Sequence, residues 1–390
     1  MNNNVLFIEC TRHYPFKYTA SNTKMELIGR GLIEQGDKVS VINPVIGDFN
    51  LASRLVSGQT KGLNYYCFLR RRSIVISLLF NLIQLHTVLK KLKDRTSTNT
   101  VVLLETVYPL YLVYIAMAKF SGYKIVNIIH EWHLAWPRKG LTRVSAFLFD
   151  KTFGYFVDGI LPISLYLENK IRRFHKPMLR VPILADYADN EYDMKYGSTV
   201  DNYFFFCGGA VYFRVIKVLI DSFCLFVRER HDRQQLQLVL YGSEQEMHRI
   251  ASYINETNYV DRIRILPQLS NEELKQKMER AIALLIPLSE NSEIDKARFS
   301  QKIAEYLSAR RPIITVNVGE IQYYFKDAVN AYIVPTLEAS LIADKMKKAV
   351  EDPAESDLIG LNGYQVGLSC FDYKKHGSSI HRFLLEINKS

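Results

Sequence analysis

The feature that most constrains this fold is an alternation of short apolar runs and helix-length amphipathic segments, which occurs twice along the 390 residues. Such alternation is typical of parallel α/β sheets, in which each strand is followed by a crossover helix. A polar stretch rich in turn formers, residues 185–202, separates the two series. The sequence therefore predicts an α/β protein with two doubly wound Rossmann-like domains that face a central cleft.

Changes in the hydrophobic pattern set the limits of the expected strands and helices. The first series gives strands at 5–9, 38–43, 100–105, 124–129 and 159–164, with helices at 23–35 and 109–120. The second gives strands at 203–207, 236–241, 263–266, 283–286 and 312–316, with helices at 215–229, 244–255, 271–280 and 300–309. Gly36 follows the first helix, where a helix end favours a left-handed residue. We expect domains at 1–190 and 191–370, and a C-terminal helix within 371–390 that returns toward the first domain.

The cysteines and the N-terminus indicate a reducing compartment. The five cysteines are scattered and contain no C-x-x-C pair: Cys10, Cys67, Cys207, Cys224 and Cys370. This pattern argues against a disulfide framework or a zinc site. The start MNNNVLFIEC leads straight into an apolar run, without the basic flank and cleavage site of a secretion signal. We therefore expect a cytoplasmic protein.

The positive charge is concentrated in the first half of the chain. Residues 1–190 hold 25 Lys and Arg against 13 Asp and Glu, whereas residues 191–390 hold 25 against 27. A one-sided positive field attracts polyanions such as nucleic acid, anionic lipid head groups or a phosphorylated acceptor. A solvated basic surface without a partner is the alternative. No nucleic-acid-binding module is visible, so we expect no nucleic-acid partner.

One uncharged segment, residues 73–89, raises the question of a membrane span. It is shorter than the roughly 20 apolar residues that a span needs. A polar stripe also recurs at helical spacing: Ser73, Ser77, Asn81, Gln84 and Lys91. Cations flank the segment on both sides: Arg70, Arg71 and Arg72 before it, and Lys90, Lys91, Lys93 and Arg95 after it. We expect a buried or interfacial helix, and a protein peripheral to the anionic inner face of the cytoplasmic membrane. A core helix with solvated ends is the alternative.

A motif in the second half carries the clearest family signal. The segment RFSQKIAEYLSARRPIITVNVGE, residues 298–320, resembles the donor-site segment of retaining GT-B glycosyltransferases of the glycogen-synthase-like superfamily 4, the bacterial glycosyl transferases group 1. Five residues fall on the pattern P-S-K-x-x-E-Y-L-A-x-G-K-P in register: Lys302, Glu305, Tyr306, Leu307 and Pro312. A carboxylate one turn inside a helix can accept bonds from both ribose hydroxyls, and the helix N-terminus near Ser300 offers N–H groups to a diphosphate. A solvent-facing helical glutamate is the alternative for Glu305.

Two further segments resemble the same family. In FCGGAVYFRVIKVLIDSF, residues 206–223, Gly208 matches the first glycine of the nucleotide domain, Gly209 follows it, and Arg214 stands where the family has lysine. A cation there neutralises the departing diphosphate, with Lys217 as an auxiliary donor-site residue. Ordinary exposed helix cations are the alternative. In IVNIIHEWH, residues 125–133, His130 matches the family histidine that contacts the transferred sugar or stabilises the reaction centre.

The chain departs from the family pattern at several positions. The E-x7-E motif requires an acidic residue eight positions before Glu305, where this chain has Ala297; Glu290, Glu293 and Asp295 are the candidate replacements. The family arginine is replaced by Gly209, and the glycine of G-K-P by Arg310. No D-x-D carboxylate clamp occurs in the sequence, so we expect a metal-independent enzyme without a cofactor.

The resemblance implies a retaining glycosyltransferase that uses a UDP- or GDP-sugar. The first domain would hold the acceptor and the second the donor. The acceptor would be a glycan or a lipid-linked glycan of bacterial surface polysaccharide or glycolipid synthesis, which fits the basic first half. A nucleotide-sugar epimerase and a non-catalytic GT-B scaffold are the alternatives, the latter motivated by Ala297, Gly209 and Arg310.

Overall fold

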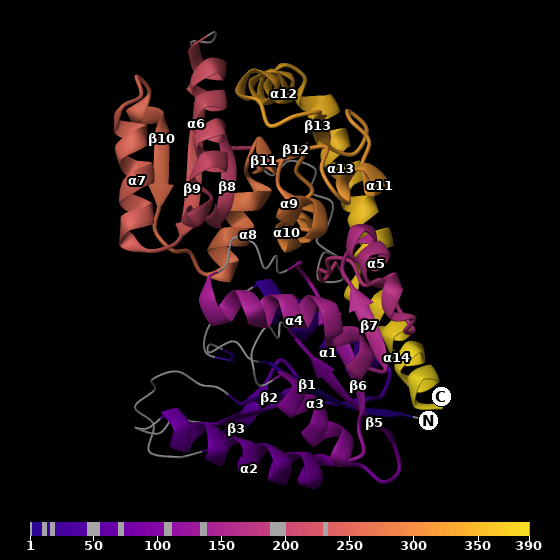
Figure 1. The fold of residues 1–390 in the computed structure, drawn as a ribbon. Helices are drawn as coiled ribbons and strands as arrows, with labels where there is room; N and C mark the ends of the chain where they lie inside the picture. The colour runs from indigo at the N-terminus through magenta and orange to yellow at the C-terminus, as the bar shows by residue number, and fades with distance from the viewer. Residues whose placement is uncertain are drawn as a thin grey trace. The chain divides into compact units, whose positions relative to one another are not determined.

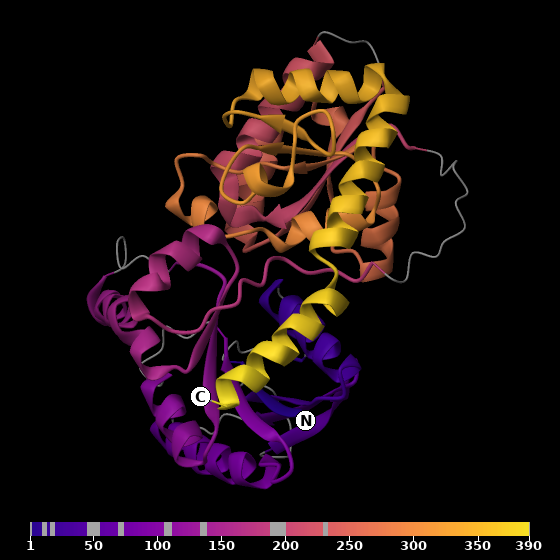
Figure 2. The same ribbon diagram turned by 90° about the vertical axis from the view of Figure 1, so that its right-hand side faces the viewer.

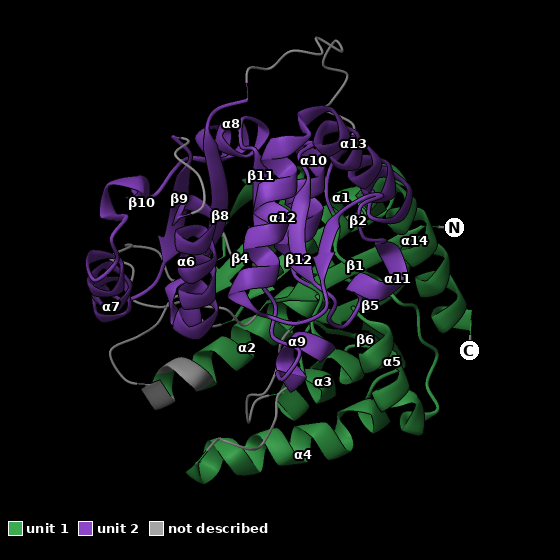
Figure 3. Ribbon diagram, turned by 90° about the horizontal axis from the view of Figure 1, so that it is seen from above, with its two compact units in different colours: residues 1–184, 297–299, 373–390 green, residues 185–296, 300–372 purple. Residues whose placement is uncertain are grey.

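The computed structural model describes residues 2–9, 14–15, 20–44, 55–68, 74–104, 111–132, 139–187, 200–228 and 233–389. The chain divides into two compact units (Figure 3). Unit 1 comprises Met1–Leu184, Ala297–Phe299 and Tyr373–Ser390, and unit 2 comprises Ala185–Lys296 and Ser300–Asp372. Each unit contains one sheet that is wholly or mainly parallel, which confirms the prediction of two Rossmann-like α/β domains.

Unit 1 is built on a seven-stranded sheet with the order β3-β4-β2-β1-β5-β6-β7 (Figure 1). Its elements are β1 (Asn3–Ile8), α1 (Ala20–Glu34), β2 (Lys38–Asn43), β3 (Leu55–Thr60), β4 (Leu63–Phe68), α2 (Ile74–Leu92), β5 (Thr98–Leu103), α3 (Tyr111–Phe120), β6 (Lys124–Ile129), α4 (Gly140–Phe156), β7 (Gly159–Pro162), α5 (Leu165–Ile171), the 3₁₀ helix η1 (Arg172–Phe174) and α14 (Tyr373–Lys389). Only β3 runs antiparallel to its neighbour, β4. The pair β3–β4 turns at Lys61 and Gly62, which have φ of 47° and 84°.

Helices cover both faces of this sheet. In Figures 1 and 2, α2, α3 and α4 lie on one face, and α1 and α14 lie on the other. The strand residues Val5 and Val41 are fully buried in a core that also includes Met25 and Leu32 of α1 and Leu384 of α14. The last helix of the chain therefore completes the core of the first unit.

Unit 2 is built on a six-stranded parallel sheet with the order β10-β9-β8-β11-β12-β13. Its elements are β8 (Tyr203–Gly209), the 3₁₀ helix η3 (Ala210–Tyr212), α6 (Phe213–Arg228), β9 (Gln235–Tyr241), α7 (Glu244–Asn255), the 3₁₀ helix η4 (Val260–Arg262), β10 (Ile263–Leu266), α8 (Asn271–Glu279), β11 (Ala283–Ile286), α9 (Glu293–Ala297), α10 (Gln301–Ser308), β12 (Ile313–Val316), α11 (Ile321–Tyr324), β13 (Tyr332–Val334), α12 (Ala339–Glu351) and α13 (Pro353–Cys370). Helix α6 packs beside α12, and α10 packs beside α13. The strand run Phe204–Phe205 is fully buried at the centre of the sheet.

The first helix ends as the sequence predicts. Gly36 follows α1 with φ of 85°, and its N–H donates to the carbonyl of Ile33 at 2.9 Å. This left-handed position is costly for residues with a Cβ, which is why glycine closes the helix and allows the chain to enter β2 directly.

The expected polar stripe does not lie on one side of α2, because Asn81 is buried whereas Lys91 is exposed. Ser73 lies outside the described residues, and the structure does not describe the side chain of Ser77. Asn81 is buried on α2, where its side-chain amide donates to the carbonyl of Pro44 at 2.6 Å. The amide can be buried because it finds a backbone acceptor. None of the described helices combines the length and apolarity that a bilayer span requires.

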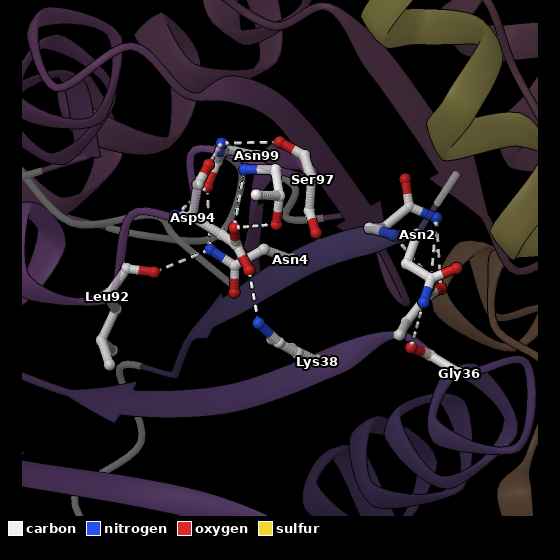
Figure 4. A network of polar contacts seen from close by, with 11 residues as sticks. Asn2, Asn4, Gly36, Lys38, Leu92, Asp94, Ser97 and Asn99 are labelled. Carbon is white, nitrogen blue, oxygen red and sulfur yellow. Dashed lines mark hydrogen bonds and ion pairs between the residues drawn. The ribbon is translucent and has the colours of Figure 1, made fainter.

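A network of polar contacts fixes the turn between α2 and β5 (Figure 4). Asn4 on β1 donates to the carbonyl of Leu92 and to the side-chain oxygen of Asn99, both at 2.8 Å. Asp94 pairs with Lys38 at 2.5 Å, and it also accepts the N–H and hydroxyl of Thr96. The bonds to Lys38 and Thr96 hold the pKa of the Asp94 carboxyl well below its usual range. The network thereby fixes the end of α2 at Leu92.

Candidate functional site

Helix α10 presents a pair of opposite charges one turn apart. Its buried face is formed by Ile303, Ala304, Tyr306 and Leu307. Lys302 and Glu305, three residues apart, lie on one face of the helix, and their side chains are 29% and 27% exposed. The Lys302 Nζ lies 2.9 Å from the Glu305 Oε2. A carboxylate has four acceptor positions, so this pairing leaves Glu305 able to accept further hydrogen bonds.

The N-terminus of the same helix has no side-chain cap. Ser300 occupies the N-cap position with extended backbone, and its hydroxyl makes no capping hydrogen bond. The first amides of a helix that are left without a capping side chain point their N–H groups outward, where an anion binds well. Ser300, Lys302 and Glu305 are thus presented by one short helix, as the sequence motif predicts.

A tyrosine connects α10 to the central strand of the sheet. The backbone N–H of Cys207 on β8 donates to the hydroxyl of Tyr306 at 2.8 Å. Strand β11 pairs with β8 only at Phe204 and Phe205, so Tyr306 satisfies the β8 backbone beyond the point where that pairing ends. Tyr306 is fully buried, and this burial raises its pKa well above the ordinary value. The bond fixes the position of α10 against β8.

The charge of Lys302 is stabilised by its surroundings. Burial by itself lowers the pKa of Lys302, but attraction to the Glu305 carboxylate and the hydrogen bond to it raise this pKa above the ordinary value. Tyr241 ends β9 in register with Gly209 of the neighbouring strand β8. The cluster therefore holds a permanent cation near the carboxyl ends of β8 and β9.

Sequence reasoning did not include Cys207 or Tyr241 in the site. Both lie at the carboxyl ends of predicted strands, which is where ligands of such sheets bind, and this position is the signal that could have identified them. Burial, chiefly, raises the pKa of the Cys207 thiol. The Tyr241 side chain is 38% exposed, so its ring is accessible at the end of β9.

The loop from β8 to α6 carries the predicted glycines and arginine. A Cβ on Gly208 would lie 2.6 Å from a ring carbon of Phe206, so a larger residue would have to displace this ring. Gly209 has an ordinary φ of −76°, and a Cβ there would make only normal contacts. Arg214, the second residue of α6, is exposed and forms no ion pair with any residue that the structure describes. Its guanidinium is therefore available to an anion.

Lys217 contacts Tyr253 and Asp221 rather than the Lys302–Glu305 pair. Its Nζ donates to Tyr253 of α7 at 2.6 Å and lies 2.9 Å from the carboxylate of Asp221. The Tyr253 hydroxyl also donates to Asp221, which closes the triangle. Hydrogen bonds to Tyr253 and Asp221 raise the pKa of Lys217. The structure thus brings Lys217 together with α7, and not with Lys302 and Glu305.

The three acidic residues proposed to replace the residue missing at Ala297 differ in their hydrogen bonds and in their exposure to solvent. The carboxylate of Asp295 is buried and accepts the N–H of Ser289 at 3.0 Å. Glu290 accepts the N–H of Leu337 at 3.1 Å. Glu293, at the start of α9, is half exposed, and its carboxylate lies 2.9 Å from the Lys296 Nζ. Asp295 and Glu290 therefore order loops, whereas Glu293 is accessible.

The position expected to be acidic is closed to solvent. Ala297 is fully buried, and its carbonyl accepts a hydrogen bond from the hydroxyl of Ser164. A carboxylate at this position would have to be desolvated or would have to displace these contacts. Alanine is the residue that this packing accommodates.

In unit 1, the expected histidine lies at the carboxyl edge of the sheet. His130 directly follows β6 and is 8% exposed. Glu9 follows β1 and is fully buried. Strand β5 lies between β1 and β6, so both residues belong to the same edge. Glu9 was not among the predicted site residues, although an acidic residue directly after an apolar strand is a recognisable signal.

Among the described residues, no three His, Cys, Asp or Glu side chains gather as a metal site. The described cysteines, Cys67, Cys207, Cys224 and Cys370, are all free thiols.

Comparison with known families and structures gives a consistent result. Residues 190–366 match the family described as glycosyl transferases group 1. No curated protein matches this sequence.

Several solved structures resemble the whole chain. Sucrose-phosphate synthase from Thermosynechococcus elongatus is 14% identical with a TM-score of 0.71, and 99% of each chain is covered. Anabaena HepE, solved in complex with UDP and glucose, is 12% identical with a TM-score of 0.71, covering 98% of this chain and 99% of that one. A glycosyltransferase from Rickettsia africae is 10% identical with a TM-score of 0.71, covering 100% of this chain and 99% of that one. At these identities the likeness shows a shared fold, the GT-B architecture.

Proposed function

Because residues 190–366 belong to the glycosyl transferases group 1 family, the chain is a glycosyltransferase, and we propose that it moves a sugar from a UDP- or GDP-sugar to a glycan or lipid-linked acceptor. The observation that carries the proposal is the pairing of Lys302 with Glu305 next to the uncapped N-terminus of α10. HepE, a protein of the same fold, was solved with UDP and with UDP-glucose.

Helix α10 supplies two contacts to a nucleotide diphosphate. Glu305 accepts hydrogen bonds from the ribose hydroxyls, and Lys302 pairs with its carboxylate. The N–H groups after Ser300, together with the helix dipole, bind the diphosphate. Gly208 has no side chain to cover its backbone in the β8–α6 loop, so the same ligand can approach this backbone closely.

Other residues act on the charge that develops during transfer. In the reaction the bond between the sugar C1 and the diphosphate oxygen breaks, and a bond from C1 to the acceptor oxygen forms. The proton of the acceptor hydroxyl passes to the departing phosphate oxygen. Arg214 stabilises the negative charge on the leaving diphosphate. His130 of unit 1 contacts the transferred sugar, and Glu293 takes the acidic role that Ala297 does not provide.

The finer features of the proposal follow from the family and the charge distribution. The transfer retains the anomeric configuration. It needs no metal, because the helix N-terminus and the cations neutralise the diphosphate. The enzyme serves bacterial surface polysaccharide or glycolipid synthesis, at the inner face of the cytoplasmic membrane. The excess of cations in residues 1–190 supports this location.

The experiment is a thermal-shift panel of nucleoside diphosphates and their sugars on the full chain, followed by a transfer assay with the donor that binds. A ligand that binds only the native state raises Tm. We expect UDP or GDP to raise Tm for the wild type and for Glu272→Ala, a control on α8, and to lose this effect in Glu305→Ala. Equal shifts in all three proteins would contradict the role of Glu305. Interconversion of the free nucleotide-sugar without transfer would identify an epimerase instead.

A further inference from the structure

One face of unit 1 carries an unusual amount of exposed apolar surface. This face is the layer of α2, α3 and α4, which lies opposite α1 and α14 across the sheet (Figure 2). Among the residues that the structure describes in unit 1, every large apolar side chain with strong exposure belongs to these three helices. Single exposed apolar residues are ordinary, but a layer of them marks an interaction surface.

Helix α2 exposes several large apolar residues to solvent. Its exposed residues follow helical spacing: Ile76 (48%), Leu79 (59%), Phe80 (40%) and Ile83 (63%). On the inner side, Asn81 is buried along with Leu85 and Leu89. The same outward face continues through Thr87 to the cations Lys90 and Lys91, which are exposed in the last turn.

Helices α3 and α4 extend this surface. On α3 the exposed residues are Leu112, Val113 and Phe120, the last 90% exposed. On α4 they are Leu141, Val144, Phe147, Leu148, Tyr155 and Phe156. The spacing Leu141, Val144, Leu148 and Tyr155 forms a continuous stripe along α4. Three neighbouring helices thus present apolar side chains on their outer sides.

The charges on the three helices have almost one sign. Their sequences include the cations Lys90, Lys91, Lys119, Arg143 and Lys151, and Asp150 is the single acidic residue. The turn after α2 adds Arg95, which is exposed. The network around Asp94 and Asn99 holds this turn in place (Figure 4). An apolar stripe bordered by cations is the pattern of a helix that lies in a membrane interface.

We propose that the outer face of α2, α3 and α4 is the docking surface for an anionic lipid bilayer, with the apolar stripes inserted at the level of the head groups. The proposal rests on the proposed function in that a lipid-linked acceptor requires the enzyme to work at a bilayer. A second copy of the chain fits this face less well, because joining two such faces would bring five cations against five. Apolar insertion also means that binding does not depend on charge alone, which distinguishes this surface from a purely electrostatic patch.

The test is co-sedimentation of the full chain with vesicles of phosphatidylethanolamine and phosphatidylglycerol, compared with neutral phosphatidylcholine vesicles. Three variants are needed. The apolar variant is Leu79→Gln, Ile83→Gln and Leu148→Gln; the charge variant is Lys90→Gln, Lys91→Gln and Lys151→Gln. The matched control changes exposed apolar residues of unit 2, Val260→Gln and Leu358→Gln, which are 48% and 56% exposed.

We expect the wild type and the control to pellet with anionic vesicles, and some binding to persist at high salt. The apolar variant should lose about ten-fold in partitioning at every salt concentration, since interfacial binding scales with the buried apolar area. The charge variant should lose the preference for anionic over neutral vesicles, because each cation near the surface contributes to that preference. Retained circular dichroism and Tm establish that the variants fold.

Equal pelleting of the apolar variant and the wild type would overturn the proposal. So would a wild type that is dimeric without vesicles and becomes monomeric in the apolar variant, because the face would then be an interface between copies. The nucleotide thermal shift, measured on the same proteins, reports on unit 2 separately. Its absence in every protein would remove the proposed function and leave the vesicle result standing.

Discussion

Gly31 of α1 and Gly377 of α14 lie where the two helices cross with their backbones in contact. A Cβ built on Gly31 would lie 2.9 Å from the α-carbon of Gly377, and one on Gly377 would lie 2.5 Å from that of Gly31. Around this crossing, Tyr373 accepts a hydrogen bond from Arg30 at 3.1 Å and donates one to Glu34 at 2.5 Å. The absence of two side chains thus allows the last helix of the chain to pack on the first.

The substitution Gly377→Ala tests this contact. Alanine favours a helix by about 1 kcal/mol over glycine, so the local effect alone would stabilise the protein. We expect a net loss of about 1–3 kcal/mol, because the methyl group must push the two backbones apart. The measurement is denaturant unfolding, with Ser378→Ala on the same helix as a control that should change little. A Gly377→Ala protein that is more stable than the wild type would show that the added methyl group causes no steric penalty at this helix crossing.

Arg310 occupies a backbone position that favours glycine. It follows the C-cap residue Ala309 of α10 with φ of 56°, and the family pattern has glycine here. Its guanidinium lies over the ring of Tyr364, 4.6 Å from the centroid. The left-handed conformation costs a residue with a Cβ about 1–2 kcal/mol, which the stacking contact partly offsets.

We therefore expect Arg310→Gly to change the stability of the wild type by less than about 1 kcal/mol, because it removes both the strain and the stacking. In a Tyr364→Leu background the same substitution should stabilise by about 1 kcal/mol or more, since only the strain is then removed. Ala328→Gly is the reference, because Ala328 has the same φ of 56°. The measurement is the free energy of unfolding of the wild type, the two single variants and the double variant. An equal effect of Arg310→Gly with and without Tyr364→Leu would mean that the stacking contact does not contribute to stability.

The sequence predicts the regular parts of the fold because their patterns are local. The strands Lys124–Ile129, Ile263–Leu266 and Ala283–Ile286 are observed at the predicted bounds, since each is a short run of mainly apolar residues. The hairpin β3–β4 was not predicted, although Lys61-Gly62 forms a two-residue turn with positive φ at both positions. A turn of this kind shows clearly in sequence only when asparagine or aspartate precedes the glycine.

The sequence is a weaker guide to which residues a side chain contacts in the folded protein. Periodicity identified a polar stripe on α2, but it could not show that Asn81 faces the protein. Lys217 lies one turn from Arg214, yet it bonds to Tyr253, 36 residues further along the chain. The proximity of Cys207 to Tyr306 likewise arises from the register of β8 against β11. Such relationships depend on tertiary packing, which no local pattern records.

Tyr306→Phe tests the connection between α10 and β8. The substitution leaves the Cys207 N–H buried without its acceptor, and we expect it to cost about 1–3 kcal/mol of folding free energy. Because Glu305 is the preceding residue, the nucleotide thermal shift should also fall. Tyr323→Phe is the matched control, since Tyr323 is 57% exposed. Unchanged stability would indicate that another group takes over as acceptor.

Metal removal tests how the diphosphate is neutralised. If the α10 N-terminus, Lys302 and Arg214 supply the positive charge, transfer should proceed in excess EDTA at a rate close to that without it. Arg214→Ala should lower kcat by about 10²-fold or more, by analogy with other groups that stabilise transition-state charge. A complete loss of activity in EDTA that magnesium or manganese restores would show that a metal ion performs this task.

Lys24 is a lysine buried in the core of unit 1. Its side chain on α1 is 2% exposed, and its Nζ donates to the carbonyl of Val181 at 2.7 Å. Burial lowers the pKa of Lys24 well below its ordinary value. Between the lowered folded-state pKa and the unfolded value of about 10.4, the unfolded chain binds one more proton than the folded chain. Stability therefore rises with pH across this window.

Lys24→Met removes the titrating group and keeps most of the volume. Two effects then oppose each other, since the variant avoids the cost of burying an amine but leaves the Val181 carbonyl without this donor. We therefore expect the difference in unfolding free energy to depend on pH: the variant gains most relative to the wild type at the lowest pH at which both fold, and the gain shrinks as pH approaches 10. Lys348→Met is the control, because Lys348 lies exposed in the last turn of α12. Parallel pH profiles for the wild type and Lys24→Met would mean that the pKa of Lys24 is the same in the folded and unfolded chains.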